Sequence, residues 1–388
     1  MKEIASKSLS WAEIDKEAII ANLSEIRRLA GQNTFSLPTR KGKKMPVETL
    51  AVIKADAYGH GMIEVAKLLR KKKVGQFAVS DIFEGKKLRK AGIKEPILLL
   101  ESTLPEHAQA IVDHKLMPTI CNAELAEALN SYAAQERKVI DVHVEVDTGM
   151  GRLGVSYKDA LSFIKSLYSL RNLRVMGIFT HFPSADTDSI FTEMQVEKLY
   201  KLVVSLDKKG MVIPYIHAAN SMGLCDYKTH VLNLVRPGLM IYGLYPLLNL
   251  KKTIKLTPAL RVYSRIILIK KVPKNSGISY GRTFIAPRDM TVAVLPLGYN
   301  DGYLRSLSNK SFVLVRGKRC PVLGRVTMDQ IIIDISHLKN VGLGERATVL
   351  GQDGREEITA DFLAYTAGTI NYEIACSLGN RLSRFYKS

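Results

Sequence analysis

A lysine at the end of an apolar run is the first residue in this sequence whose position suggests chemistry. Residues 51–53 are Ala-Val-Ile, Lys54 follows them, and a turn with the sequence Tyr-Gly-His-Gly occupies residues 58–61. A lysine amine that is partly desolvated at a strand end is a nucleophile that can form an imine. The alternative for Lys54 is a structural role, with the ammonium group reaching solvent past its apolar stem.

A second candidate is the glycine-rich segment at residues 147–154, Asp-Thr-Gly-Met-Gly-Arg-Leu-Gly. Glycines allow the backbone to come close to a ligand. Arg152 carries a planar guanidinium group that can pair with a carboxylate or a phenolate. By itself, the same pattern is also typical of a surface turn with a solvated arginine.

A third group of residues has the chemistry of a phosphate site. The amides of Gly238 and Leu239 follow Arg236 closely, and Ser221 supplies a hydroxyl group after the preceding apolar run. The sequence contains no Walker loop and no G-x-G-x-x-G motif. We therefore expect the kind of phosphate site that barrels form after strands seven and eight. A buried arginine paired with a carboxylate is the alternative for Arg236.

The last candidate is Tyr280, which lies between glycines in the segment Gly-Ile-Ser-Tyr-Gly-Arg-Thr-Phe at residues 277–284. Residues 297–302 and 324–330 form two further polar segments among β-branched runs. Each segment by itself is typical of a hairpin turn. Only their combination with the first three candidates gives them a functional meaning.

Eight short apolar runs position the first three candidates, and they lie at residues 49–53, 77–79, 97–99, 117–120, 139–146, 175–179, 215–218 and 234–235. Segments with helical spacing of apolar residues lie between them, at residues 62–71, 82–91, 123–134, 158–167 and 191–208. Parallel strands require such helical crossovers. The pattern predicts a (β/α)8 barrel, and active sites of barrels lie at the carboxyl ends of the strands.

After about residue 245 the pattern changes to β-branched runs interrupted by Gly, Pro, Asn and Asp, at residues 259–271, 290–297, 312–315, 331–335 and 347–350. This pattern predicts a mostly β domain, with a helix at residues 361–368. We predict an α/β chain with a TIM-type barrel at residues 10–245 and a mostly β domain at residues 246–388. The first few residues are expected to pack with the second domain.

Composition excludes several classes of protein. The chain has 388 residues, and no apolar run approaches the ~20 residues of a membrane helix. The first eleven residues lack the apolar stretch of a signal peptide. The cysteines are too far apart for a typical disulfide framework or metal site, which fits a cytoplasmic protein: Cys121, Cys225, Cys320 and Cys376. The net charge of +19 is spread over scattered runs, so we expect no dedicated nucleic-acid binding.

Taken together and in this order, the segments resemble the alanine racemase family of fold-type III pyridoxal-phosphate enzymes, from Trp11 to near the C-terminus. The resemblance implies pyridoxal 5'-phosphate as cofactor, alanine as substrate, and no metal ion. It implies interconversion of L- and D-alanine by two bases, supplying D-alanine for peptidoglycan and cell-wall biogenesis. It also implies a homodimer with shared active sites.

The resemblance implies a role for each candidate residue. Lys54 would hold the cofactor and act as base on one face of the substrate, and Tyr280 of the other subunit would act on the opposite face. Arg236 would face the pyridine nitrogen, and His181 would lie beside the ring. The cofactor's phosphate would be held by Tyr58, Ser221, Gly238, Leu239 and Tyr372.

Further residues would support the substrate. Arg152 and the Met328 amide would receive its carboxylate, Tyr299 would line the entry channel, and Asp329 would support the site. Many family members carry a carbamylated lysine before the glycine-rich motif, whereas this sequence has Glu145. We hypothesise that Glu145 supplies the negative charge to the arginine directly.

The chemistry agrees with this assignment, because two bases on opposite faces can racemise a bound amino acid without turning it over. An arginine opposite the pyridine nitrogen stays protonated and keeps that nitrogen unprotonated. Two alternatives remain at this point. One is a racemase that prefers another small amino acid such as serine, because an apolar pocket excludes a hydroxyl only weakly. The other is a non-catalytic pyridoxal-phosphate carrier, which would lack the β domain and Tyr280.

Overall fold

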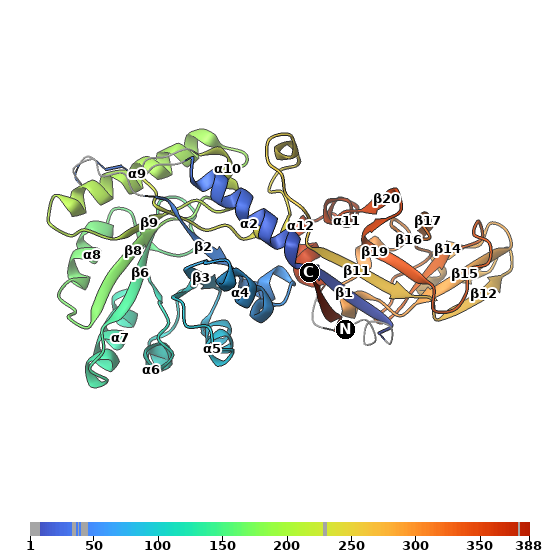
Figure 1. Cartoon of the computed structure of the whole chain (residues 1–388), viewed down its shortest axis with the longest axis horizontal. Helices are drawn as coiled ribbons and strands as arrows, with labels where there is room; N and C mark the ends of the chain where they lie inside the picture. The colour runs from blue at the N-terminus through green and yellow to red at the C-terminus, as the bar shows by residue number, and fades with distance from the viewer. Residues whose placement is uncertain (1–7, 33–35, 38, 40–45, 228–230, 379–380) are drawn as a thin grey trace.

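The computed structural model describes residues 8–388 except 33–35, 38, 40–45, 228–230 and 379–380. Residues 31–46 are a polar and basic stretch of the sequence, and most of them lie outside the described residues. The described chain forms two bodies side by side, a barrel and a β domain (Figure 1). This architecture confirms the predicted fold class.

Eight parallel strands form the barrel, and each coincides with one of the predicted apolar runs. They pair in the order β4-β3-β2-β10-β9-β8-β6-β5, and a parallel bridge between Leu98 and Met117 nearly closes the ring from β4 to β5. The strands are β2 (Glu48–Val52), β3 (Gln76–Val79), β4 (Ile97–Leu99), β5 (Thr119–Ile120), β6 (Ile140–Asp147), β8 (Leu173–Phe179), β9 (Tyr215–His217) and β10 (Leu234–Val235). The two-residue strand β7 (Val155–Ser156) pairs with β6 outside the ring.

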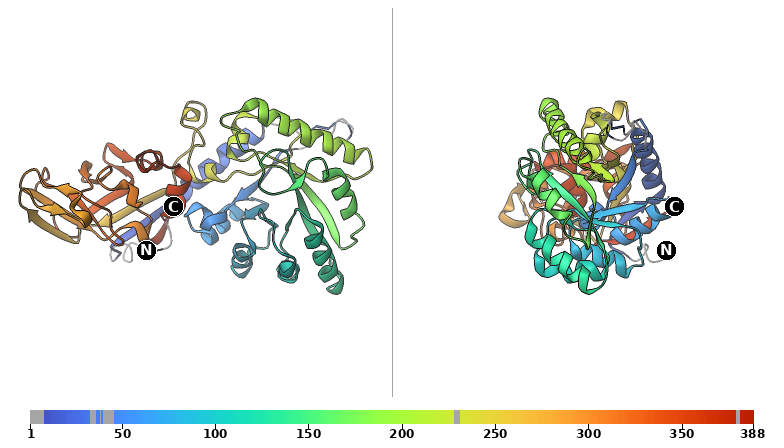
Figure 2. Two further views of the ribbon diagram at one scale, coloured as in Figure 1. Left: turned by 180° about the vertical axis from the view of Figure 1, so that it is seen from behind. Right: turned by 90° about the vertical axis from the view of Figure 1, so that its left-hand side faces the viewer.

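Helices surround these strands, as the end-on view in Figure 2 shows. They are α4 (Met62–Lys71), α5 (Ile82–Lys90), α6 (Ala108–Asp113), α7 (Ala123–Gln135), α8 (Ala160–Leu167), α9 (Ser189–Asp207) and α10 (Ser221–Asp226). Several begin at an Asp or Asn whose side chain accepts a hydrogen bond from the first turn, namely Asp81, Asn122, Asp188 and Asn220. Such N-caps satisfy backbone donors that have no partner inside the helix.

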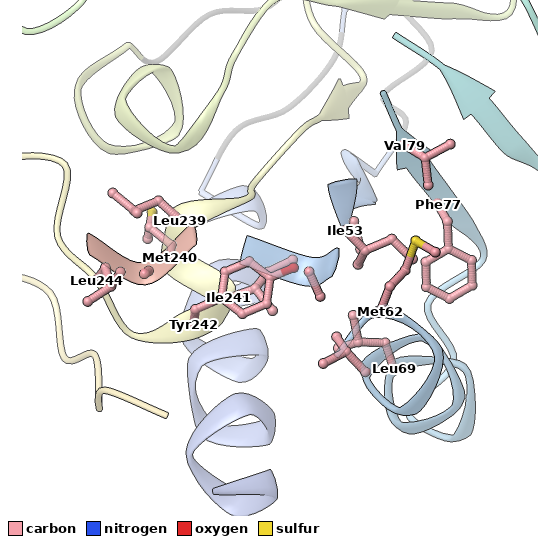
Figure 3. Close-up of a cluster of buried hydrophobic side chains, with 14 of the residues drawn as sticks. Ile53, Met62, Leu69, Phe77, Val79, Leu239, Met240, Ile241, Tyr242 and Leu244 are labelled. Atoms are coloured by element: carbon pink, nitrogen blue, oxygen red, sulfur yellow. The ribbon is translucent and has the colours of Figure 1, made fainter. Parts of the chain in front are cut away.

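The barrel core is continuous with the segment after the last strand. Side chains of β3 and α4 pack with Ile53, and the turn η3 (Leu239–Tyr242) lies on the other side of the same cluster (Figure 3). Tyr242 is fully buried there, and its hydroxyl donates to the Val52 carbonyl at 3.0 Å. The segment after β10 is thereby tied to the strand that precedes Lys54.

The β domain is built around a sheet with the order β17-β16-β19-β11-β1-β21. Strand β1 (Ser10–Asp15) comes from the N-terminus and pairs with β11 and β21, and helix α2 (Lys16–Ala30) then leads to the barrel. The strands are β11 (Leu260–Arg265), β16 (Phe312–Val315), β17 (Lys318–Pro321), β19 (Arg346–Asp353), β20 (Glu356–Ile358) and β21 (Ser383–Lys387).

Smaller sheets and two helices complete this domain. A three-stranded sheet contains β12 (Leu268–Val272), β15 (Met290–Leu295) and β18 (Ile331–Asp334), and a hairpin contains β13 (Gly277–Ile278) and β14 (Phe284–Ile285). Helices α11 (Ala360–Ala367) and α12 (Asn371–Ser377) lie at the junction with the barrel (Figure 1). No helix in the described part of the chain has the length and hydropathy of a membrane span.

Candidate active site

A cavity of about 670 Å³ lies where the barrel strands end. Five strands deliver residues to it: Lys54 follows β2, Glu145 lies near the end of β6, and later strand ends provide His181, Ser221 and Arg236. The cavity collects ten of the predicted residues in one place: Lys54, Tyr58, Glu145, Arg152, His181, Ser221, Arg236, Gly238, Leu239 and Tyr372.

The turn that carries Lys54 has an unusual backbone. The segment α3 (Lys54–Tyr58) is one short helical turn, but Ala55, Asp56, Ala57 and Tyr58 have φ values of 53, 51, 57 and 51°. The left-handed region costs roughly 1–2 kcal/mol for each residue that has a side chain. Surrounding contacts must therefore hold this turn in place.

Contacts from both domains hold it. The Glu84 carboxylate accepts from the Ala55 amide at 2.7 Å and from the Ser80 amide at 2.8 Å. From the β domain, Arg384 pairs with Asp56 at 3.2 Å and donates to the Gly59 carbonyl at 2.9 Å. The position of Lys54 thus depends on one carboxylate of the barrel and one guanidinium group of the β domain.

Arg236 is the end of a buried chain of hydrogen bonds. Its Nη1 donates to His217 Nδ1 at 2.7 Å, so the proton of His217 is on Nε2, which donates to His143 Nδ1 at 2.8 Å. Burial lowers the pKa of His143 to about 3 and the pKa of His217 well below its ordinary value, so both rings are neutral. Burial also lowers the pKa of Arg236 to about 10, which leaves it protonated at neutral pH.

His181 completes this part of the cavity. Its Nδ1 lies 3.3 Å from Arg236 Nη2, which also donates to the carbonyls of Thr180 and Ala218 at 3.0 Å. Burial, with smaller effects of the charges on Arg236, Arg152 and Lys54, lowers the pKa of His181 to about 3. A neutral imidazole therefore lies beside a fixed cation.

Sequence reasoning gave no role to His143 or His217. His143 is fully buried in β6 among valines, and a histidine inside an apolar strand was the available signal. A lone histidine of this kind does not reveal its partner, which lies 74 residues further along the chain.

Backbone amides and hydroxyl groups gather around Gly238. Ser221 Oγ accepts from the Gly238 amide at 3.2 Å and from the Met240 amide at 3.4 Å. A Cβ atom on Gly238 would lie 2.4 Å from Tyr58 Oη, so any larger residue here would displace the tyrosine ring. The rings of Tyr58 and Tyr372 lie 6.2 Å apart and form the neighbouring wall.

Glu145 carries a carboxylate in a buried position of the same cavity. Burial raises its pKa to about 7, although the charges of Arg236 and Arg152 favour the ionised form. Its Oε2 atom has no hydrogen-bond partner among the described residues. The carboxylate is therefore free to pair with a group that moves or enters.

The other predicted residues lie on the β domain and do not line this cavity. Tyr280 is 71% exposed, Met328 is 52% exposed and Tyr299 is 42% exposed. The Tyr299 amide donates to the Thr327 carbonyl, so Tyr299 lies beside the loop of Met328. The exposed Asp329 in that loop pairs with Arg381 at 2.5 Å.

The turn of Tyr280 lies against the same loop. Ser279 Oγ donates to the Arg325 carbonyl at 2.6 Å, and Ser279 and Gly281 have φ values of 61 and 69°. The structure thus separates the predicted residues into a cavity on the barrel and an exposed polar group on the β domain. A single chain does not bring Lys54 and Tyr280 into one cavity.

Comparison with known proteins points to one family. A family model described as alanine racemase, N-terminal domain, matches residues 14–246, and one described as alanine racemase, C-terminal domain, matches residues 259–386. Two curated relatives are named alanine racemase. The protein from Halothermothrix orenii is 41% identical over 98% of this chain and 97% of its own length, and that from Carboxydothermus hydrogenoformans is 40% identical over 97% and 99%.

Solved structures give the same result. The alanine racemase of Clostridium difficile 630 matches with a TM-score of 0.91 and 35% identity, covering 98% of this chain and 96% of that one. The alanine racemase of Bartonella henselae with covalently bound pyridoxal phosphate matches with a TM-score of 0.84 and 25% identity, covering 98% and 100%.

Proposed function

The chain belongs to the alanine racemase family, and from this premise we propose how its residues divide the work of interconverting L- and D-alanine. The enzyme is an alanine racemase that depends on pyridoxal 5'-phosphate. Which residues act, and in which assembly, is our proposal. The observation that carries it is the collection of ten predicted residues in one cavity while Tyr280 remains exposed on the β domain.

The cavity on the barrel has the chemistry that the cofactor needs. Gly238 leaves room where a Cβ atom would meet Tyr58, and the nearby amides and hydroxyl of Ser221 suit a phosphate group. Leu239 and Tyr372 extend this wall. When bound, pyridoxal phosphate acts as the electron sink that acidifies the Cα proton of the amino acid.

Arg236 and His181 would fix the ring of the cofactor. His217 receives a hydrogen bond from Arg236 and is itself neutral, so the arginine keeps its full charge and a fixed orientation. A protonated arginine in this position would donate to the pyridine nitrogen and leave it unprotonated. We hypothesise that this arrangement limits side reactions such as transamination.

Lys54 would hold the cofactor covalently and move the proton on one face of the substrate. Tyr280 would move the proton on the opposite face, as expected for racemisation of a substrate that does not turn over. Since Tyr280 is 71% exposed and lines no part of the cavity of its own chain, we propose that it completes the cavity of a second copy. The enzyme would then be a homodimer with two shared sites.

Arg152 would receive the substrate carboxylate together with the Met328 amide of the partner's loop. Glu145 would balance the charge of Arg152 in place of a carbamylated lysine, because its buried carboxylate carries an unused acceptor atom. Tyr299 and Asp329, on the same exposed face as Met328, would line or support the entrance.

The biological setting is also a proposal. We keep the division into a cofactor-binding barrel at residues 10–245 and a mostly β domain at residues 246–388, with Ser10–Asp15 contributing to the second. D-alanine would serve peptidoglycan synthesis and cell-wall biogenesis. A cytoplasmic location fits the four cysteines, which are all free.

Subunit complementation tests the shared site. Lys54→Ala and Tyr280→Phe are expected to inactivate the enzyme separately. In co-expressed, separately tagged chains, a mixed dimer would contain one site with both bases and one with neither, so random pairing should restore roughly a quarter of the native activity. If each site used Lys54 and Tyr280 of one chain, every site in the mixture would lack a base, and activity would stay at the level of the single variants.

A further inference from the structure

A second cavity, of about 250 Å³, lies at the junction of the barrel and the β domain. Its walls are mostly apolar and come from both sides of the junction, including Tyr242, Leu256, Leu350, Ile358 and Ala360. Its charged lining residues are Lys251 and Glu357, which are exposed, and Asp361, which is partly exposed. Racemisation as proposed above makes no use of this cavity, which we call the junction cavity.

One residue that lines this cavity, His60, carries a buried polar atom without a partner among the described residues. His60 is 1% exposed and lines the junction cavity, and its Nδ1 lies 3.1 Å from the Ala57 carbonyl and 2.8 Å from the Tyr58 carbonyl. Carbonyls only accept, so Nδ1 carries the proton and Nε2 is an unprotonated acceptor. Nε2 makes no hydrogen bond to any described residue. A buried acceptor without a partner is costly, so a ligand that donates here gains selectivity.

The protonation state of His60 limits which ligands can bind here. Burial lowers the pKa of His60 to about 4, so the ring is neutral at physiological pH. Of the acidic lining residues, Glu357 is exposed, and Asp361 accepts from Asn371 Nδ2 at 2.7 Å and lies 3.8 Å from Lys251 Nζ. The interior therefore favours an uncharged donor, such as a hydroxyl group, over an ammonium group.

The junction cavity shares a wall with the active-site cavity. Tyr242 faces the former and Tyr58 the latter, and their ring centroids are 5.0 Å apart. Ala375 and Cys376 of α12 likewise line the two cavities from neighbouring positions. His60 itself lies just after the left-handed turn that begins at Lys54.

We propose that the junction cavity binds a small, mostly apolar hydroxyl compound of about the size of phenol, whose hydroxyl group donates to His60 Nε2. A cavity of this volume exceeds the ~30 Å³ share of one water molecule several-fold, and its walls offer water few further partners. The apolar body of the ligand would lie against Leu256, Leu350 and Ile358. A ligand bound in the junction cavity would affect the cofactor through the contact between Tyr242 and Tyr58, which form the shared wall.

Binding to the holoenzyme tests the site directly. Phenol is titrated by ligand-observed NMR with saturating alanine present, and toluene serves as the probe of equal shape without a donor. We expect phenol to bind roughly tenfold more tightly than toluene, because only phenol satisfies His60. Equal binding of phenol and toluene would show that the cavity does not select a donor. No binding of phenol would show that the cavity holds only water. Either result would overturn the proposal.

A pair of variants locates the binding. Ala360→Leu fills the junction cavity from α11, whereas Ala367→Leu adds the same side chain at the other end of that helix, outside the cavity. We expect Ala360→Leu to abolish phenol binding and Ala367→Leu to leave it intact, with racemisation in the absence of phenol unchanged in both. Bound phenol should shift the visible absorbance of the cofactor in the native enzyme and not in Ala360→Leu. Unchanged binding in Ala360→Leu, or no shift, would refute the inference.

Discussion

Replacing Glu145 by glutamine should stabilise the protein by an amount that grows with pH. Glu145 is only 4% exposed, and its pKa rises from the usual 4.5 to about 7 because burial disfavours the carboxylate more than Arg236 and Arg152 favour it. The native state therefore binds a proton that the unfolded chain has already lost between these two values. Stability from this group is fully present below pH 4.5 and is lost as the pH rises to about 7.

The magnitude follows from the size of the shift. Each pKa unit corresponds to about 1.4 kcal/mol, so a rise from 4.5 to about 7 amounts to about 3 kcal/mol of lost stability above pH 7. At pH 5.5 the loss is only about 1 kcal/mol. Glutamine has no charge to bury. The free energy of unfolding of Glu145→Gln, relative to that of the native chain, should therefore be about 2 kcal/mol higher at pH 8.5 than at pH 5.5.

Urea unfolding at both pH values, at one protein concentration, measures this difference. Glu127→Gln replaces a solvent-exposed carboxylate on α7 by an amide and serves as the matched control. The same Glu145→Gln enzyme should racemise alanine more slowly above pH 7, where the native carboxylate balances Arg152. A stability gain that is equal at both pH values would refute the assignment of the shift to burial.

Three further predictions concern other parts of the molecule. Gly238→Ala places a Cβ atom 2.4 Å from Tyr58 Oη, and overpacking of about 1–3 kcal/mol should weaken cofactor binding ~10-fold or more in equilibrium dialysis. Arg236→Glu should raise the yield of pyruvate from alanine by transamination, whereas Arg236→Lys, which keeps the charge, should not. Asn22 is fully buried, and Asn22→Ala breaks its three hydrogen bonds, two of them with Thr257, which should lower the free energy of unfolding by about 3 kcal/mol in urea titrations.

Hydrophobic periodicity was sufficient for the barrel, because each parallel strand is a short apolar run between amphipathic helices. The helix predicted at residues 62–71 coincides with α4 (Met62–Lys71). Periodicity could not reveal that residues 259–271 contain two strands, β11 and β12, which belong to different sheets. That separation depends on partners far along the chain, such as β19 and β15.

The left-handed turn after Lys54 shows a second limit. Ala55, Asp56 and Ala57 have left-handed backbone. Local propensity would instead favour right-handed backbone, particularly for the two alanines. Contacts from Glu84 and Arg384 override that preference, and both partners lie too far away in sequence for a local pattern to indicate them. Motif order led us to propose Lys54 as the cofactor lysine, but only the fold explains how its position is maintained.

These contacts give the β domain two tasks at two different sites. Through Arg384 it holds the turn of Lys54 in its own chain, and through Tyr280, as we propose, it supplies the second base to the partner. A barrel without this domain would keep the cofactor cavity but lose the guanidinium group that balances Asp56 and fixes Gly59. Left-handed backbone at four successive residues would then relax, because its cost of roughly 1–2 kcal/mol per residue would have less to offset it. With the roles that we propose for Lys54 and Tyr280, the β domain is needed for the first base as much as for the second.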